Sequence, residues 1–220
     1  MQQILQTAVE NGVVPFAVAA RVTGGGMEET AASGGAKPDS LFRMASMTKA
    51  ITSAAVMQLV EQGRVDLDAP AANYLERLRD VRVLDGFDAD GTPRLRTPRS
   101  APTTRQLLTH TAGFSYAIWN QDVQRMAAYL GMDAAAGIDE GILDLPLIAD
   151  PGTCWEYGTN TDVLGVMVEA VTGRSLDDYF AEHLFEPLGM SDTHFNVPEH
   201  KQKRLLESIS PLLDLLEGDI

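Results

Sequence analysis

The chain has 220 residues, of which 45% are hydrophobic and 22% are charged, close to the average for a soluble globular protein. This composition excludes collagen-like, disordered and disulfide-scaffold proteins, and the length allows a hydrophobic core without metals or disulfides. With 17 basic and 31 acidic residues, the formal net charge is −14. Because such a charge repels phosphate backbones and anionic membrane surfaces, we expect no nucleic acid and no membrane among the partners.

The single cysteine and the N-terminal residues bear on cellular location. Cys154 has no second thiol for an internal disulfide, and we expect it to be small and half-buried. The first six residues contain neither a basic nor an apolar signal segment, and no stretch approaches the roughly 18 apolar residues of a membrane-spanning helix. We therefore expect an intracellular, cytoplasmic protein.

The first third of the chain predicts a helix, a hairpin and a long buried helix. Apolar residues share one helical stripe over 2–11. Two short runs, 16–22 and 28–33, flank three consecutive glycines and predict a β-hairpin. A helix then begins at Ser46 and ends near Gly63, and its apolar middle predicts burial on nearly all sides.

The remainder predicts shorter helices separated by loops. A proline in the first turn predicts a helix over 66–78. Residues 79–102, rich in Gly, Pro and Asp, predict a solvated loop whose arginines pair with its own acidic residues rather than bind an anion. Further helices are predicted at 103–108, 121–130, 140–148, 161–171 and 175–185. The sequence thus predicts a mostly helical α+β protein with a small N-terminal strand element.

A serine and a lysine at the start of the buried helix form the most informative local pattern, Ser46-Met47-Thr48-Lys49. Residues three apart share a helix face, so the Ser46 hydroxyl and the Lys49 amine can converge. A partly desolvated amine can take the proton of a serine nucleophile, and the N–H groups of a helix N-terminus suit the oxyanion of an acyl-transfer intermediate. Alternatively, Ser46 is a helix N-cap and Lys49 extends its charge to solvent.

The second candidate is Tyr157, which follows a Pro151-Gly152 turn and precedes a helix. A phenol at that place can pass a proton between nucleophile and leaving group. Alternatively, it packs at the helix entry with its hydroxyl hydrogen-bonded. The four histidines lack metal-ligand spacing, and the G-x-S-x-G elbow, the P-loop and the dinucleotide fingerprint are absent, so we expect no cofactor.

Several separated blocks occur in the order found in the β-lactamase-related serine hydrolases. They are Ser46-Met47-Thr48-Lys49, Leu107-Leu108-Thr109-His110-Thr111-Ala112-Gly113-Phe114, Pro151-Gly152-Thr153 before Trp155-x-Tyr157, Asp162-Val163-Leu164-Gly165, and Phe185-Glu186-Pro187-Leu188-Gly189-Met190. Over residues 13–197 the chain resembles this family and, within it, the family VIII carboxylesterases, which are relatives of class C β-lactamases and D-alanyl-D-alanine carboxypeptidases. The resemblance implies the β-lactamase/penicillin-binding-protein transpeptidase-like fold, with a helical lobe and an incomplete antiparallel sheet.

The same resemblance implies roles for individual residues. Ser46 would be the acyl-enzyme nucleophile, Lys49 its base or proton relay, and Tyr157 the group that passes the proton to the leaving group. The backbone N–H of Ser46 would be one oxyanion donor. The residues implied for substrate binding are Phe114, Tyr116, Trp119, Asn120 and Thr159.

Two features depart from the family pattern. The β-lactamase motif Tyr-x-Asn has Thr159 in third place, with Asn160 one position later, which favours esters over β-lactams. The third motif, a Lys-Thr-Gly, His-x-Gly or Trp-Gly-Gly on a C-terminal strand, is not found. We therefore expect a β-lactamase-related domain over 1–197 and an atypical helical tail over 198–220. Either that tail or a partner chain, such as a second copy, covers the open sheet edge, or the chain is a truncated product.

Two classes of function remain. The first is a serine hydrolase that cleaves carboxylic esters through an acyl-enzyme, with weak β-lactam hydrolysis left open and a β-lactamase or D-Ala-D-Ala carboxypeptidase as the alternative enzyme. The second is a catalytically silent remnant or binding module, because loss of one oxyanion donor lowers kcat by about 10²–10³-fold. For the enzyme, the partner is a small-molecule ester or β-lactam, and the mechanism needs no cofactor.

Overall fold

The computed structural model describes residues 1–132 and 140–207. The chain divides into two compact units. One comprises Met1–Ala45 together with the segment that starts at Asp192, and the other comprises Ser46–Ser191. All residues of the predicted catalytic group belong to the second unit.

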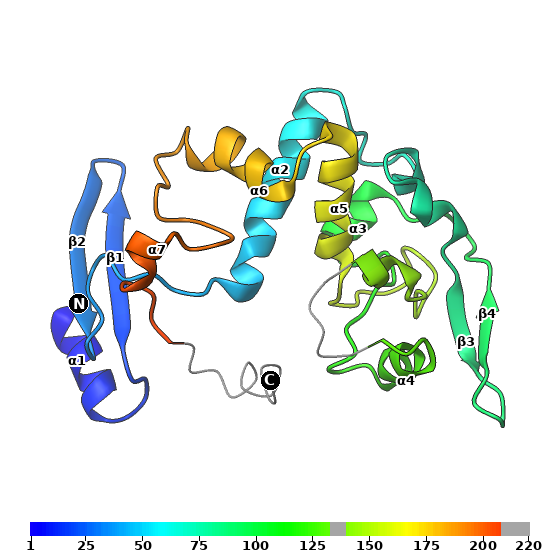
Figure 1. Cartoon of the computed structure of the whole chain (residues 1–220), viewed down its shortest axis with the longest axis horizontal. Coiled ribbons are helices and arrows are strands. Elements are labelled where there is room, and N and C mark those ends of the chain that lie inside the picture. The colour runs from blue at the N-terminus through cyan, green and yellow to red at the C-terminus, as the bar shows by residue number, and fades with distance from the viewer. Residues whose placement is uncertain (133–139, 208–220) are drawn as a thin grey trace. The chain divides into compact units, whose positions relative to one another are not determined.

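The predicted N-terminal hairpin forms the centre of the first unit. β1 (Ala17–Thr23) and β2 (Gly26–Ser33) pair antiparallel, with an irregular register after Arg21. α1 (Gln2–Glu10) lies beside β2 (Figure 1). Within the two described ranges, β1 has β2 as its one strand neighbour, as the sequence predicted.

A short C-terminal segment completes this unit. α7 (Glu199–Gln202) precedes Leu205, which forms an isolated parallel bridge with Leu41. Arg204 pairs with Asp192 and Asp39. The rest of the expected tail, residues 208–220, lies outside the described residues, so the covering of the β1 edge stays a prediction.

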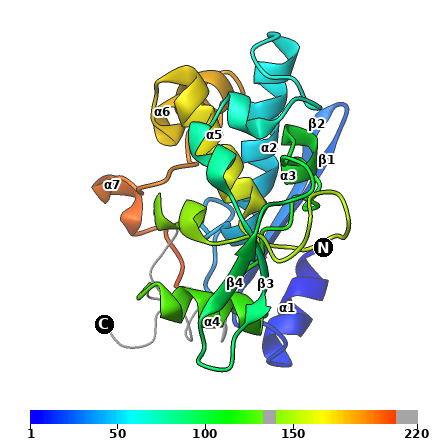
Figure 2. The ribbon, with the colours of Figure 1, turned by 90° about the vertical axis from the view of Figure 1, so that its right-hand side faces the viewer.

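A helical core fills the second unit. α2 (Thr48–Glu61) packs against α5 (Asn160–Thr172) and α6 (Leu176–Phe180), and α3 (Thr104–Leu108) packs against α5 (Figure 2). The side chains that fill this core are mainly leucines, valines and phenylalanines, including Val56, Leu59, Leu107, Leu164, Met167 and Phe180. The core therefore fixes the start of α2 relative to the start of α5.

One prediction about α2 is wrong. The helix buries Thr52, Ala55, Val56 and Leu59, whereas Ala50, Ala54 and Met57 on another face are exposed. A sequence with few polar residues does not distinguish a helix that is covered all round from one with an exposed apolar stripe, because periodicity is lost in both.

Most of the other predicted helices are observed, but the helix predicted over 66–78 is replaced by two separate 3₁₀ turns, and the one predicted over 140–148 is reduced to a single 3₁₀ turn. α4 spans Gln121–Tyr129, and Thr103 caps α3 in a capping box with Gln106. Ser175 caps α6, which continues as a π-helical turn. The short turns are 3₁₀ segments at Ala45–Met47, Ala71–Asn73, Glu76–Asp80 and Glu140–Asp144, and the π-helical turn at Ala181–Phe185.

Residues 79–102 do not form the predicted loop. β3 (Val83–Phe87) and β4 (Pro93–Arg96) make a second antiparallel hairpin (Figure 2). Its turn contains Asp90-Gly91, with Gly91 at φ +90°, a conformation that favours glycine. Pairing within the segment is observed as predicted, Arg94 with Asp88 and Arg96 with Asp85. Arg96 also pairs with Asp150, an acidic residue outside the segment that was not predicted as its partner.

Candidate active site

Ser46, Lys49 and Tyr157 meet at the start of α2. The Tyr157 hydroxyl donates a hydrogen bond to Ser46 Oγ at 2.8 Å, and Lys49 Nζ donates to the same oxygen at 3.3 Å. Ser46 is exposed, in the 3₁₀ turn that leads into α2. The N-cap of α2 is Met47, so the Ser46 hydroxyl engages Tyr157 and Lys49 and does not cap the helix.

An unusual backbone angle precedes the serine. Ala45 has φ +44°, in the left-handed region that costs a residue with a side chain roughly 1–3 kcal/mol. A residue is held in such a conformation only when its surroundings determine it, and this often occurs at functional sites.

The loop that carries Tyr157 is anchored at Asp150. Arg96 in β4 binds both carboxylate oxygens of Asp150, at 2.8 and 2.9 Å, and the backbone N–H of Arg99 donates at 2.9 Å. The Arg96 hydrogen bonds, followed by that of Arg99, lower the pKa of Asp150 to about 2. Thr153 bonds back to the Asp150 carbonyl through both its N–H and its hydroxyl. The unpredicted β3–β4 hairpin thus holds the beginning of this loop.

A backbone-to-backbone contact fixes the other side of the loop. A Cβ on Gly158 would lie 2.3 Å from Ser115 Cα and 2.4 Å from the Phe114 carbonyl oxygen. Any larger residue would therefore push the two segments apart. This close approach places Tyr157 next to the loop that carries Tyr116.

Four aromatic rings surround Tyr157. The distances from its ring centroid are 4.8 Å to His110, 5.8 Å to Tyr116, 5.6 Å to Trp119 and 6.2 Å to Trp155. Trp119 also donates from Nε1 to the Tyr157 carbonyl at 3.0 Å. Trp119 is 50% exposed and Trp155 is 67% exposed, so both indoles present apolar surface beside Tyr157.

Lys49 places a positive charge beside the rings of Tyr157 and Tyr116. Its ammonium lies 5.0 Å from the Tyr157 ring centroid and 5.5 Å from that of Tyr116. Burial raises the pKa of Tyr157, but hydrogen bonding from Ser46 and Lys49 and the charge of Lys49 outweigh it, so the pKa lies below 10.0. This tyrosine therefore ionises more readily than a free phenol.

Tyr116 behaves in the opposite way. Its hydroxyl donates to Asp162 Oδ2 at 2.9 Å. Burial, then the charge of Asp162, raises the pKa of Tyr116 far above its usual value, so it remains a neutral donor. Burial likewise raises the pKa of Asp162, although the Tyr116 hydrogen bond and Lys49 oppose the shift.

The residues implied for substrate binding fall into two groups. Tyr116 and Trp119 lie next to Tyr157. Phe114 is buried in the core, Asn120 caps α4 through its side-chain oxygen, and Thr159 is buried without a partner for its hydroxyl. The placement of the last three at a substrate pocket stays a prediction.

Three neighbours of the catalytic group were not among the predicted site residues: His110, Trp155 and Asp162. Each lies in one of the blocks that carry the family resemblance, and this was the signal available. None of the three has a short motif of its own. Short motifs do not reveal residues whose neighbours come from distant parts of the sequence.

The single cysteine and the other potential ligand side chains form no further site in the described ranges. Cys154 is exposed, which corrects the expectation of a half-buried thiol; it lies on the loop side of the Pro151 turn, where little covers it. Over residues 1–132 and 140–207, no three His, Cys, Asp or Glu side chains are grouped to hold a metal ion. In the same ranges, no helix is long and apolar enough to cross a membrane.

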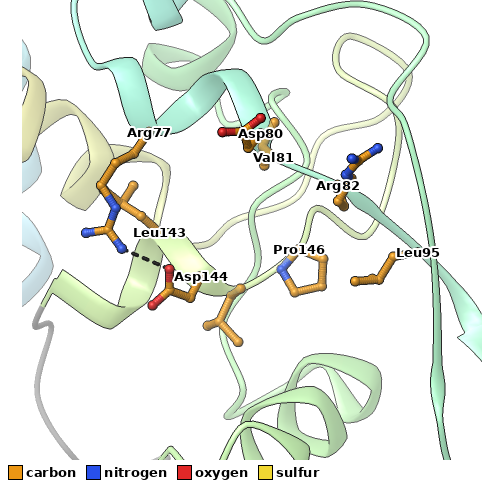
Figure 3. Close-up of a pocket in the computed structure, with 9 residues that line it drawn as sticks. Arg77, Asp80, Val81, Arg82, Leu95, Leu143, Asp144 and Pro146 are labelled. Atoms are coloured by element: carbon orange, nitrogen blue, oxygen red, sulfur yellow. Dashed lines mark hydrogen bonds and ion pairs between the residues drawn. The ribbon is translucent and has the colours of Figure 1, made fainter.

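A cavity of about 320 Å³ has a lining that does not include Ser46 (Figure 3). Arg77 and Asp144 form an ion pair at its edge, 2.8 Å apart. Its lining consists of Arg77, Asp80, Val81, Arg82, Leu95, Leu143, Asp144, Leu145 and Pro146. None of the catalytic candidates contributes to it.

Comparison with known proteins gives the family. The family described as Beta-lactamase matches residues 1–212. Monacolin J acid methylbutanoyltransferase of Aspergillus terreus is 38% identical over 163 residues, which cover 73% of this chain and 39% of that protein. Lovastatin esterase of Penicillium rubens is 32% identical over 89% of this chain and 52% of its own length. The structure of simvastatin synthase from Aspergillus terreus superposes with a TM-score of 0.79, at 31% identity, over 92% of this chain and 54% of that one.

The fold and these relatives define a β-lactamase-fold protein related to serine hydrolases and acyltransferases. The chain belongs to the β-lactamase family. This confirms the predicted family and fold class, a helix-rich protein with small antiparallel sheets. The chain spans about half, or less, of the length of the relatives that it matches.

Proposed function

We propose that this chain catalyses acyl transfer from a carboxylic ester through an acyl-enzyme on Ser46. The observation that carries the proposal is the convergence of the Tyr157 hydroxyl and the Lys49 ammonium on Ser46 Oγ, at 2.8 and 3.3 Å. Two titratable groups on one exposed hydroxyl match the arrangement of an activated nucleophile. The family relationship supports the same chemistry.

The proposed steps follow from the hydrogen bonds. Tyr157, as phenolate, takes the Ser46 proton while Oγ forms a bond to the ester carbonyl carbon. Collapse of the tetrahedral intermediate breaks the bond to the leaving alkoxide, which receives that proton from Tyr157. The Lys49 side chain stabilises the phenolate by its hydrogen bond and charge, and the backbone N–H of Ser46 is one donor to the oxyanion.

The second half of the reaction has two outcomes. Water on the acyl-enzyme gives hydrolysis, and an alcohol gives a new ester. The named activities of the relatives include both classes, an esterase and a methylbutanoyltransferase. The exposed indoles of Trp119 and Trp155 favour an apolar acyl or alcohol group beside Ser46, since aromatic faces offer large contact areas.

Turnover of p-nitrophenyl butyrate tests the proposal. We expect release of p-nitrophenol by the wild-type chain, its loss in Ser46→Ala, and no change in Ser100→Ala, which alters an exposed serine in another loop. Intact mass after brief mixing should show one butyryl group on Ser46. Addition of a small alcohol then separates the two outcomes, because a butyrate ester forms only if the alcohol competes with water.

The alternative is a catalytically silent binding module. A fluorophosphonate probe distinguishes it, because covalent labelling requires an activated serine but no deacylation. Labelling of wild type and not of Ser46→Ala supports an acylating site. Absence of both labelling and turnover contradicts the proposal.

A further inference from the structure

His110 forms hydrogen bonds with the backbone on both sides of Tyr157. Its carbonyl oxygen accepts the Glu156 N–H at 2.8 Å, and its Nδ1 accepts the Gly158 N–H at 3.4 Å. Its ring lies against the Tyr157 ring at 4.8 Å. One residue therefore contacts the tyrosine and the peptide units before and after it.

The side-chain amide of Asn160 lies against the imidazole of His110. Its Nδ2 lies 3.1 Å from the Phe114 carbonyl oxygen and 3.3 Å from that of Glu156. Because carbonyl oxygens only accept hydrogen bonds, the atom that faces them is the amide nitrogen. The same Nδ2 lies 3.1 Å from His110 Nδ1.

The backbone N–H of Gly158 donates to His110 Nδ1, which must therefore present a lone pair. In neutral histidine the proton is then on Nε2, which lies 3.5 Å from Thr161 Oγ1. A proton on Nδ1 would direct an N–H toward the Gly158 N–H and the Asn160 amide nitrogen. The Gly158 hydrogen bond would be lost, and the turn around Tyr157 would lose its support.

We propose that neutral His110, in its Nε2-protonated form, is the positioning residue of Tyr157, and that protonation of Nδ1 releases the Tyr157 turn. The inference rests on the proposed function of Tyr157 in proton transfer. His110 itself does not touch the reacting atoms. It acts on the distance between the Tyr157 hydroxyl and Ser46 Oγ.

The surroundings favour the neutral form. Five titratable side chains lie on the segments around His110. They are Lys49 on α2, Tyr116 on the loop that follows His110, Glu156 and Tyr157 on the loop before α5, and Asp162 on α5. Asp162 is engaged by Tyr116, and Glu156 accepts a hydrogen bond from Ser115. Burial, followed by the charge of Lys49, lowers the pKa of His110 below 6.5.

The backbone at this position provides a conservative variant. His110 has φ +56°, which asparagine tolerates better than most residues. The Oδ1 of asparagine lies where Nδ1 of histidine lies, so His110→Asn keeps an acceptor that does not titrate over the acid range. His110→Leu removes the acceptor, and His200→Asn changes an exposed histidine in the other unit.

Ring ¹⁵N correlation spectra of the whole chain report the tautomer without any need for turnover. We expect Nδ1 to be unprotonated at neutral pH, and the Tyr157 ring resonances to shift as His110 becomes protonated. Observation of a proton on Nδ1 at neutral pH would overturn the inference. Because this measurement does not depend on activity, it separates the inference from the proposed esterase function.

The pH dependence of kcat provides a second test of the role of His110. We expect the acid limb of kcat in the wild type and in His200→Asn to follow the protonation of His110 seen by NMR. His110→Asn should retain kcat at neutral pH and lose this limb, and His110→Leu should lower kcat by about 10²-fold with little change in KM, the effect of a misplaced catalytic group. An acid limb that persists unchanged in His110→Asn contradicts the proposal.

Discussion

Tyr157 and Ser46, 111 positions apart in the chain, share a 2.8 Å hydrogen bond in which the phenol is the donor. Because Lys49 also donates to Ser46 Oγ, the serine oxygen accepts two hydrogen bonds and its own proton points elsewhere. This arrangement is a resting state. For Ser46 to become a nucleophile, the Tyr157–Lys49 pair must first lose one proton, and that proton belongs to the pair rather than to either residue.

Removal of the Tyr157 hydroxyl tests its place in the relay. We expect Tyr157→Phe to lower kcat by about 10²–10⁴-fold, the range for general acid–base groups, with the fold retained. Stopped-flow acylation with p-nitrophenyl butyrate measures the affected step. Tyr129→Phe is the matched control, since Tyr129 is exposed on α4. Equal rates in the two variants would show that the phenol has no part in acylation.

Lys49 controls the ionisation of Tyr157. Lys49→Met keeps the length of the side chain and removes its charge and hydrogen bonds, so the pKa of Tyr157 should rise from its lowered position. The alkaline rise of kcat should move to higher pH with it. Ultraviolet titration of phenolate absorbance, compared with Lys37→Met at an exposed position, checks both shifts. An unchanged phenolate titration would contradict the coupling.

Asp150 makes stability depend on pH. Its pKa is lowered from 3.8 to about 2 in the folded chain, so its stabilisation is present above 3.8 and is lost as the pH falls toward 2. We expect Asp150→Asn to reduce the free energy of unfolding at neutral pH and to flatten its decline in this acid window. Urea unfolding at a series of pH values measures both. Glu186→Gln, at an exposed carboxylate, should leave the dependence of the unfolding free energy on pH unchanged.

The two tryptophans of the chain both lie in ring contact with Tyr157. Their fluorescence should therefore change when a fluorophosphonate occupies Ser46. The single-tryptophan variants Trp119→Phe and Trp155→Phe should each retain part of the change, and Ser46→Ala should show none. A constant emission during labelling would mean that the bound group does not reach the indoles.

The sequence pointed to Ser46, Lys49 and Tyr157, which the structure brings together, because their signals are local or familial. Ser46 and Lys49 share one helical turn, and Tyr157 follows a Pro-Gly turn. The helix predicted over 103–108 is observed as α3, whose cap at Thr103 depends on a few neighbouring residues. The same is true of the first hairpin, with its alternating small residues and its glycines.

Features that depend on partners distant in sequence were missed. β4 carries Arg94 and Arg96 where apolar residues would mark a strand, and the two shortest contacts of Arg96 are with Asp150, 54 positions later. The Asp90-Gly91 turn was the available signal, since Asp-Gly between short extended runs is typical of a hairpin. His110 had no local signal, because its role comes from the Gly158 N–H that the fold brings to Nδ1.

The two exposed indoles beside Tyr157 are held differently. Trp119 is hydrogen-bonded to the Tyr157 carbonyl, and Asp150 and Gly158 fix the loop that carries this tyrosine, whereas Trp155 meets Tyr157 through a ring contact. Substitution of Trp155 can therefore alter which acyl or alcohol group fits while these hydrogen bonds are kept. In directed evolution, position 155 is where substrate range can be varied most freely, and positions 119, 150 and 158 should be left unchanged.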